Sequence, residues 1–242
     1  MIPILYLEKT DSTNRYLINL IESDQVKEGI AVFSFNQTKG RGQKGNAWIS
    51  EPGKNLCYSI FIKPDHLPVR NQFIISQVIS LATKAFLEEF SGNISIKWPN
   101  DIYWNDKKIA GILIENKLKK DIIEYSVIGI GVNINQIRFP KNLPNPVSLS
   151  QIIGKEYDLN EIANKFHHKI RTSLEELNLG TEGDIQRYYV NSLYHRDGFH
   201  SYKSQDVIFS AKIRGVSALG NLMLEHEDGN VKNYAFKEIE YI

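Results

Sequence analysis

The sequence predicts an α+β protein with a mixed or antiparallel sheet, helices packed on one face of that sheet, and a small β-barrel at the C-terminal end. Two observations lead to this fold class. Helix-period and strand-like segments alternate through the first 195 residues, whereas the tail after Gly198 contains only short alternating strands. With 242 residues and 42% hydrophobic content, the chain is large enough to bury a substantial core. We therefore expect one domain at residues 1–195 and a small barrel at residues 196–242.

Four segments have the apolar spacing of amphipathic helices. Asp11 and Ser12 offer N-caps to the first, and Gly92 closes the second. The third and fourth repeat their apolar residues at intervals of three and four. The predicted helices are residues 11–23, 71–90, 158–177 and 184–194.

The strands are predicted from β-branched and aromatic runs bounded by turn residues. Three prolines between residues 138 and 147 mark a loop, and Asp228-Gly229 marks a hairpin turn near the C-terminus. The predicted strands are residues 29–37, 56–62, 94–98, 109–115, 125–135, 207–216, 221–227 and 231–242.

Charge and cysteine content exclude several classes of protein. There are 29 basic and 28 acidic residues, a formal net charge of +1, so binding of nucleic acid through bulk charge is not expected. No segment has the length of apolar sequence that spans a bilayer, and the first residues lack the basic leader of a signal peptide. The single cysteine, Cys57, excludes an internal disulfide and indicates a reducing, cytoplasmic location, with the thiol buried as a small apolar group.

The first segment with candidate chemistry is the basic loop at residues 38–48. Its residues 40–45 match G-x-G-x-x-G after a strand, but Trp48 and a Pro-Gly pair follow where a dinucleotide-binding turn would open a helix. Lys39, Arg41 and Lys44 give this loop positive charge without any acidic residue. It is either an anion-binding loop between strands, mobile because of its glycines, or an exposed turn.

The second candidate segment is a strand with glycines on one face. Gly129, Gly131 and Asn133 alternate with apolar residues, so they share a face, and Gly111 lies in another strand with the same pattern. If these strands are neighbours, they form a flat floor for a planar ligand. Packing of a helix on the sheet is the alternative explanation.

The third candidate segment is Lys-Trp-Pro-Asn-Asp at residues 97–101. Pro99 fixes the backbone so that Asn100 and Asp101 point in a defined direction, and Lys108 follows after a short turn. The cluster suits a charged substrate and a metal ion, or it is an ordinary Asn-Asp turn.

Together and in this order, five motifs resemble those of the biotin–protein ligase family. They are DSTN at 11–14, QTKGRG at 37–42 with Trp48, KWPND at 97–101, KIAGILIE at 108–115 and GIGVNIN at 129–135. The resemblance implies a core like that of class II aminoacyl-tRNA synthetases and an SH3-like C-terminal barrel. It also implies the class that only ligates, without an N-terminal DNA-binding domain.

The resemblance further implies a reaction in two steps. Biotin and ATP, with Mg²⁺, give biotinyl-5'-AMP, and biotin then passes to a lysine of a biotin carboxyl carrier protein of a carboxylase. The implied catalytic residues are Lys108, Arg41, Asn100 and Asp101, with Asp101 able to act through Mg²⁺. The implied biotin-binding residues are Ser12, Thr13, Asn14, Gln37, Arg41, Gly42, Gln43, Lys108, Gly111 and Gly129. The implied ATP or adenylate-binding residues are Lys39, Gly40, Arg41, Trp48, Lys97, Asn100, Lys108 and Asn133, with Trp48 stacking on the adenine.

Two departures and two alternatives accompany this hypothesis. Gln43 and Asn46 stand where the family often has arginines, which predicts a weaker hold on the adenylate. A lipoate–protein ligase is similar in fold and chemistry, but its arginine and glycine-triplet pattern is missing. A ligand-sensing module without catalysis would not explain Lys108 beside the Asn-Asp pair. We expect no nucleic-acid or membrane partner, and the sequence leaves monomer and homodimer open.

Overall fold

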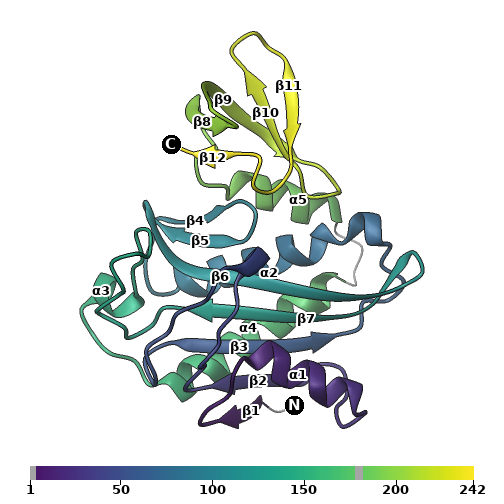
Figure 1. The fold of residues 1–242 in the computed structure, drawn as a ribbon, viewed down its shortest axis with the longest axis vertical. Coiled ribbons are helices and arrows are strands. Elements are labelled where there is room, and N and C mark those ends of the chain that lie inside the picture. The colour runs from purple at the N-terminus through teal and green to yellow at the C-terminus, as the bar shows by residue number, and fades with distance from the viewer. Residues whose placement is uncertain (1–3, 178–181) are drawn as a thin grey trace.

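The larger part of the molecule is a seven-stranded mixed sheet. The computed structural model describes residues 4–177 and 182–242. The strands are β1 (Ile4–Leu7), β2 (Ala31–Ser34), β3 (Leu56–Ile62), β4 (Ile94–Lys97), β5 (Asp101–Trp104), β6 (Lys107–Lys119) and β7 (Ile122–Val132). Their order is β1-β2-β3-β7-β6-β5-β4, with β1 and β2 parallel and every other pair antiparallel. The predicted mixed sheet is therefore confirmed (Figure 1).

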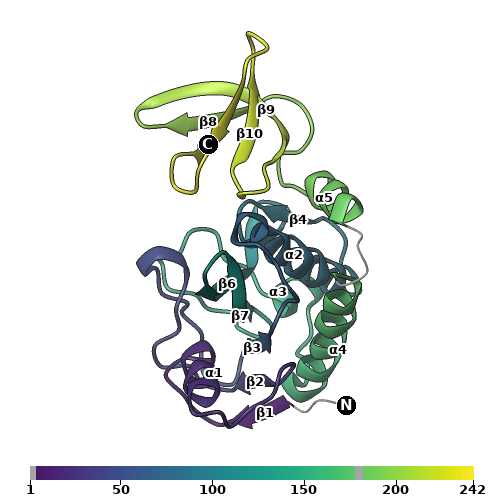
Figure 2. The same ribbon diagram turned by 90° about the vertical axis from the view of Figure 1, so that its right-hand side faces the viewer.

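Helices cover both faces of this sheet, not one. The helices are α1 (Thr13–Glu22), α2 (Phe73–Glu88), α3 (Leu149–Ile153), α4 (Leu159–Leu177) and α5 (Glu182–Asn191). Figure 2 shows α1 on one side of the sheet and α2 and α4 on the other. Adjacent residues of β3 show the division, because Tyr58 contacts His167 of α4 and Ser59 contacts Asn14 of α1. The expectation of helices on one face was wrong for α1, since periodicity along a helix does not say which face of the sheet it packs on.

Each face of the sheet has its own apolar core. The larger core lies under α2 and α4 and includes Phe86, Phe166 and the inward residues of β7, Ile128 and Ile130. The smaller core lies under α1, where Leu17 packs with buried residues of β2, β3 and β7. This second core occupies only part of its face, so the rest is left for the site described below.

The tail forms a second, five-stranded antiparallel sheet beyond the β4 edge (Figure 1). Its strands are β8 (His200–Ser204), β9 (Val207–Val216), β10 (Leu222–His226), β11 (Val231–Tyr234) and β12 (Glu240–Tyr241), in the order β11-β10-β9-β8-β12. The β-rich tail is confirmed. Within residues 182–242 the outermost strands β11 and β12 do not pair with each other, so this sheet is open where we expected a closed barrel.

Specific contacts join the tail to the core. The indole of Trp98 donates to the carbonyl oxygen of Gly220 at 2.8 Å. Gly220 has φ of +89°, and a Cβ there would lie 2.6 Å from the ring of Phe73, so both its conformation and its packing require glycine. Tyr194 donates its backbone N–H to Ile96 at 2.8 Å, which extends the β4 edge up to the expected boundary at residue 195.

Element predictions were mostly confirmed. All four predicted helices form, and β3 and β9 have the predicted bounds. The short strands β1, β5 and β8, the short helix α3 and two 3₁₀ turns at Gln43–Gly45 and Val69–Asn71 were missed. The strand predicted at residues 231–242 is two strands, because the chain turns between them and Lys237 takes φ of +73°. None of the described helices combines the length and apolar character needed to cross a membrane.

Candidate active site

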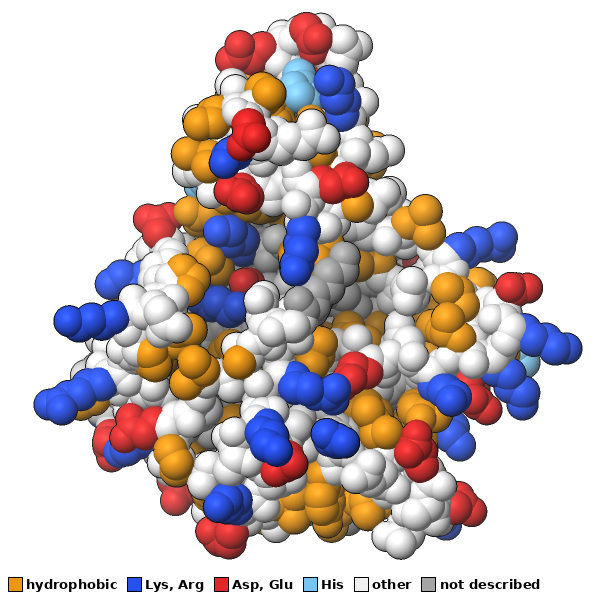
Figure 3. Space-filling view, in the orientation of Figure 1, with side chains coloured by type: hydrophobic (Ala, Val, Ile, Leu, Met, Phe, Trp, Pro, Cys, Tyr) orange, Lys and Arg blue, Asp and Glu red, His pale blue; other side chains and the backbone are white. Residues whose placement is uncertain are grey.

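A cavity of about 840 Å³ lies between one face of the larger sheet, the loop at residues 38–48 and the tail. Figure 3 shows it as a hollow below the tail, with basic side chains at its rim. Most residues singled out in the sequence line it. They are Ser12, Thr13, Asn14, Gln37, Arg41, Gly42, Gln43, Trp48, Lys97, Asn100, Asp101, Lys108, Gly111 and Gly129.

Strand register explains why distant motifs meet in this cavity. Lys97 pairs with Asp101, Asp101 with Gly111, Gly111 with Gly131, and Gly131 with Cys57. Directly paired residues share a face of the sheet, so these positions form one row across five strands. Charged side chains therefore lie at the β4 end of the row, and glycines lie in its middle.

The end of the cavity near α1 has neutral hydrogen-bonding groups. Thr13 donates its backbone N–H and its hydroxyl to Gln37 Oε1, at 2.8 and 3.0 Å. Ser59 Oγ lies 2.7 Å from Thr13 Oγ1 and donates to Asn14 Oδ1 at 2.6 Å. Such donors and acceptors suit an uncharged polar ligand such as a urea. Ser12 and Thr13 reach this place because α1 begins here, at the edge of the smaller core.

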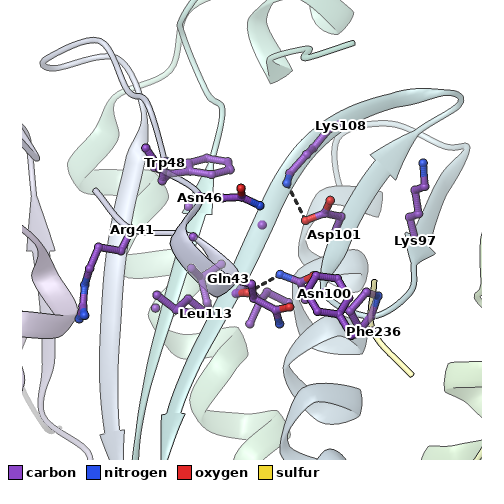
Figure 4. A pocket seen from close by; sticks show the side chains of 18 of the residues that line it. Arg41, Gln43, Asn46, Trp48, Lys97, Asn100, Asp101, Lys108, Leu113 and Phe236 are labelled. Carbon is purple, nitrogen blue, oxygen red and sulfur yellow. Dashed lines mark hydrogen bonds and ion pairs between the residues drawn. The ribbon is translucent and has the colours of Figure 1, made fainter. Parts of the chain in front are cut away.

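The opposite end has two lysines and a carboxylate. Lys108 Nζ lies 2.6 Å from Asp101 Oδ1, and both side chains are partly buried (Figure 4). Asn100 donates its side-chain amide to the carbonyl oxygen of Ile112 at 2.7 Å, which fixes the turn before β5. Burial lowers the pKa of Lys97, and nearby Lys108 lowers it further while Asp101 opposes the change. This end suits an anionic group such as a phosphate.

The glycine floor between these ends is partly covered by protein side chains. The predicted neighbouring strands are confirmed, since Gly111 pairs with Gly131. The indole of Trp48 lies directly on Gly131, where a Cβ would be 2.3 Å from its ring. Asn14 lies on Gly129 in the same way, at 2.4 Å. Gly129 therefore makes room for Asn14 in this structure, and a planar ligand would stack on Trp48 instead of lying on bare backbone.

Arg41 does not point to the lysines. Its guanidinium lies 2.7 Å from Glu115 Oε2, and Figure 4 shows it directed away from Lys108. The same oxygen of Glu115 accepts from Asn14 Nδ2 at 2.8 Å. The predicted contact of Arg41 with a phosphate needs its side chain to leave Glu115, and it stays a prediction.

Three predicted nucleotide-binding residues lie outside the cavity. Asn133 is buried and donates its side-chain amide to the carbonyl oxygen of Val147 at 3.0 Å, which supports the 138–147 loop. Its predicted contact with the adenine stays a prediction. Lys39 is exposed. Gly40 packs against the backbone of Trp48, where a Cβ would be 2.4 Å from its carbonyl oxygen.

Other cavity residues were missed in the sequence. Glu115 does not line the cavity itself but contacts two residues that do, Arg41 and Asn14. It ends a motif that we quoted, but the motif gave no reason to single it out. The tail supplies Phe236, Lys237, Ile239, Glu240 and Tyr241. No local pattern marks these tail residues, because only the docking of the tail on the core brings them to the cavity. Cys57 also lines it, but burial raises the pKa of its thiol to about 11, so it is no nucleophile at neutral pH.

The donor set suits a magnesium ion that arrives with a nucleotide. Within residues 4–177 and 182–242 no three His, Cys, Asp or Glu side chains cluster as a metal site. Asp101 brings a carboxylate into the cavity beside Lys108. In proteins Mg²⁺ is typically held by one or two carboxylates together with substrate phosphates and water. Asp101 would be the protein's contribution to that shell.

Comparisons with known proteins agree with this geometry. The profile of the biotin/lipoate A/B protein ligase family matches residues 6–133. The bifunctional ligase/repressor BirA of Escherichia coli is 31% identical over 242 residues, covering 98% of this chain and 73% of BirA. The biotin–[acetyl-CoA-carboxylase] ligase of Paracoccus denitrificans is 28% identical over 53% of each chain. A structure of the Aquifex aeolicus biotin protein ligase with biotin and ATP superimposes with a TM-score of 0.81, at 27% identity over 99% of both chains.

Proposed function

Since the chain belongs to the biotin/lipoate A/B protein ligase family, we propose that its cavity joins biotin to ATP and passes biotin to a lysine of a carrier protein. The activity is that of an ATP-dependent, AMP-forming biotin–protein ligase. The observation that carries the proposal is the division of the cavity. Neutral donors and acceptors stand at one end, and Lys97, Lys108 and Asp101 stand at the other.

In the first step the carboxylate of biotin attacks the α-phosphorus of ATP. The bond to the bridging oxygen breaks, pyrophosphate leaves, and biotinyl-5'-AMP forms. Biotin's ureido ring would bind among Thr13, Asn14 and Gln37, which places its carboxylate toward Lys108. Carboxylate and triphosphate repel each other, so positive charge from Lys108 and Lys97 is needed where they meet. Mg²⁺ bound to the triphosphate would neutralise further charge.

In the second step the neutral amine of a carrier lysine attacks the acyl carbon of the adenylate. An amide forms, AMP leaves with the electrons of the acyl–oxygen bond, and the amine nitrogen gives up one proton to solvent. Asp101 and Asn100 line the phosphate end of the cavity and would orient the incoming amine. The carrier is proposed to be a biotin carboxyl carrier protein, as the names of the relatives suggest.

Several finer expectations remain part of this proposal. We propose a catalytic domain at residues 1–195 and a C-terminal domain at residues 196–242, related to an SH3-like barrel. The contacts of the β4 edge with the chain up to Tyr194 support this boundary. The cytoplasmic location stays a prediction from the lone cysteine.

Pyrophosphate release tests the first step without any carrier. We expect release from ATP and Mg²⁺ only when biotin is present, and not when lipoate or octanoate replaces it. Lys108→Ala should lose this activity by at least 100-fold, whereas Lys107→Ala, its exposed neighbour on β6, should keep it. Release with lipoate and not with biotin would overturn the proposal in favour of a lipoate ligase.

A further inference from the structure

The ammonium group of Lys97 lies among three tyrosine rings. Its Nζ is 4.8 Å from the ring centroid of Tyr103, 4.9 Å from that of Tyr241 and 5.7 Å from that of Tyr194. It also donates to the hydroxyl of Tyr103 at 3.3 Å. The rings come from β5, from the segment after α5, and from β12 of the tail. We call these three residues the tyrosine cage.

We propose that the tyrosine cage positions Lys97 for the triphosphate, and that Tyr241 is a positioning residue by which the tail takes part in nucleotide binding. This inference rests on the proposed function. It assigns a role to a tail residue that none of the sequence motifs contains.

The chemistry of the cage is suited to this role. Within residues 4–177 and 182–242, Lys97 makes no ion pair, and the nearby Asp101 is paired with Lys108 instead. An aromatic face attracts a cation through its quadrupole but carries no net charge. The cage therefore holds the ammonium group without neutralising it. A phosphate can then bind Lys97 without first displacing a carboxylate.

The cage also limits the freedom of a long side chain. A free lysine has four rotatable bonds, and fixing them on binding costs entropy. In this structure the cage walls are themselves anchored. Tyr194 donates its hydroxyl to Asp106 Oδ1 at 2.8 Å, and Tyr241 packs edge-on against the fully buried Tyr202 with ring centroids 5.2 Å apart. Lys97 is thus held in place before any ligand arrives, which favours binding.

The ring of Tyr241, and not its hydroxyl, holds the ammonium group of Lys97. The hydroxyl oxygen is buried and has no hydrogen-bond partner among the described residues. Removing the hydroxyl should therefore change little at Lys97, whereas removing the ring should free its side chain. This difference separates Tyr241→Phe from Tyr241→Leu.

A purely structural role for Tyr241, as packing between tail and core, is the competing explanation. A double-mutant cycle separates the two, because a residue that acts through Lys97 has no further effect once Lys97 is gone. Phe209→Leu is the matched control. Phe209 lies in the same tail sheet and stacks on Tyr234, on His226 and, at 6.3 Å, on Tyr202, whereas Lys97 lies over the three cage rings. Phe209→Leu therefore tests the effect of loosening the packing of the tail next to Tyr241 without removing a ring from Lys97.

The experiment measures equilibrium binding of α,β-methylene ATP and of biotin, together with thermal unfolding. We expect Tyr241→Leu to weaken nucleotide binding on the order of 5-fold and to leave biotin binding unchanged, since a partly desolvated cation–π contact is of this size. Tyr241→Phe should restore nucleotide binding. In a Lys97→Met background, Tyr241→Leu should have no additional effect. Phe209→Leu should bind nucleotide as the wild type does.

Three results would overturn the inference. The first is that Tyr241→Leu weakens nucleotide binding equally in the wild-type and the Lys97→Met backgrounds. The second is that Tyr241→Leu leaves nucleotide binding unchanged in the wild-type background. The third is the same loss in Phe209→Leu. If Tyr241→Leu does not fold, Tyr241→Met provides a second ring-free variant for the same cycle. A wild-type protein that binds nucleotide but forms no biotinyl-5'-AMP would count against the proposed function alone.

Discussion

Gly131→Ala is predicted to displace Trp48 from the floor of the cavity. Gly131 is the last-but-one residue of β7, and the indole of Trp48 reaches it from the basic loop. In the proposed site this indole stacks on the adenine of ATP. A single methyl group added to the floor should therefore weaken nucleotide binding without touching biotin's end of the cavity.

The structure gives the size of the clash. A Cβ at Gly131 would lie 2.3, 2.5 and 2.6 Å from three atoms of the indole. Non-bonded carbon atoms rest about 3.5–4.0 Å apart, so the indole must withdraw by more than about 1 Å. At Gly111 the closest indole atom is 3.1 Å away, which a shift of a few tenths of an ångström relieves. At Gly215, in the tail, the closest atom is Met223 Sδ at 3.8 Å, an ordinary contact.

The assay is the KM for ATP in biotin-dependent pyrophosphate release, with biotin affinity measured separately. Overpacking of this kind costs about 1–3 kcal/mol, so we expect the KM of Gly131→Ala to rise about 10-fold. Gly111→Ala should show a smaller rise, and Gly215→Ala none. A wild-type KM in Gly131→Ala would refute the placement of Trp48 at the nucleotide.

Three further predictions concern release of the intermediate, pH dependence and stability. Gln43 lines the cavity, as Asn100 does, so Gln43→Arg should add positive charge to the cavity and slow dissociation of biotinyl-5'-AMP. Unchanged or faster release would count against this. Burial is the main cause that lowers the pKa of His195 from 6.5 to about 4. The positive charges of His200 and Lys97 also lower it, and Asp106 opposes the change. The unfolded chain therefore binds this proton first, so His195 contributes stability above pH 6.5 that is lost as the pH falls toward 4. In urea unfolding, the free energy of unfolding should fall less steeply between pH 6.5 and pH 4 for His195→Asn than for wild type or for His168→Asn. Equal slopes in the three proteins would contradict this prediction. Tyr58→Phe removes the buried 2.7 Å hydrogen bond to His167 Nδ1 and should lower the free energy of unfolding by about 1 kcal/mol in urea, with no change in activity; a stability equal to that of wild type would contradict it.

Long periodic segments and the strand carrying Gly129 and Gly131 could be predicted from sequence because their signals are local. The run at residues 56–62 is apolar except for Ser59 and is bounded by turn residues, so β3 was predicted with its observed bounds. The shared face of the glycines follows from the twofold period of a strand. From the sequence, the strand of Gly111 could only be assumed to lie beside this one. The strand register shows that it does, with Gly111 paired to Gly131.

Other features depend on contacts that periodicity does not encode. β5 has only four residues after Pro99, too short for a pattern, although it carries Asp101 into the cavity. The face on which α1 packs is decided by the smaller core around Leu17. Asn133 resembled a ligand-binding residue by its motif, but its amide is used by Val147, a long-range contact. Tyr241 of the tail lies in none of the sequence motifs, so nothing in the sequence marked it as a site residue.

The central claim is that this chain transfers biotin to a carrier through Lys108. The most direct measurement is the intact mass of a biotin carboxyl carrier domain after incubation with the protein, biotin, ATP and Mg²⁺. We predict a mass increase equal to one biotin minus one water with wild-type protein, and none over the same time with Lys108→Ala. An unmodified carrier with the wild type, or full modification by Lys108→Ala, would contradict the account.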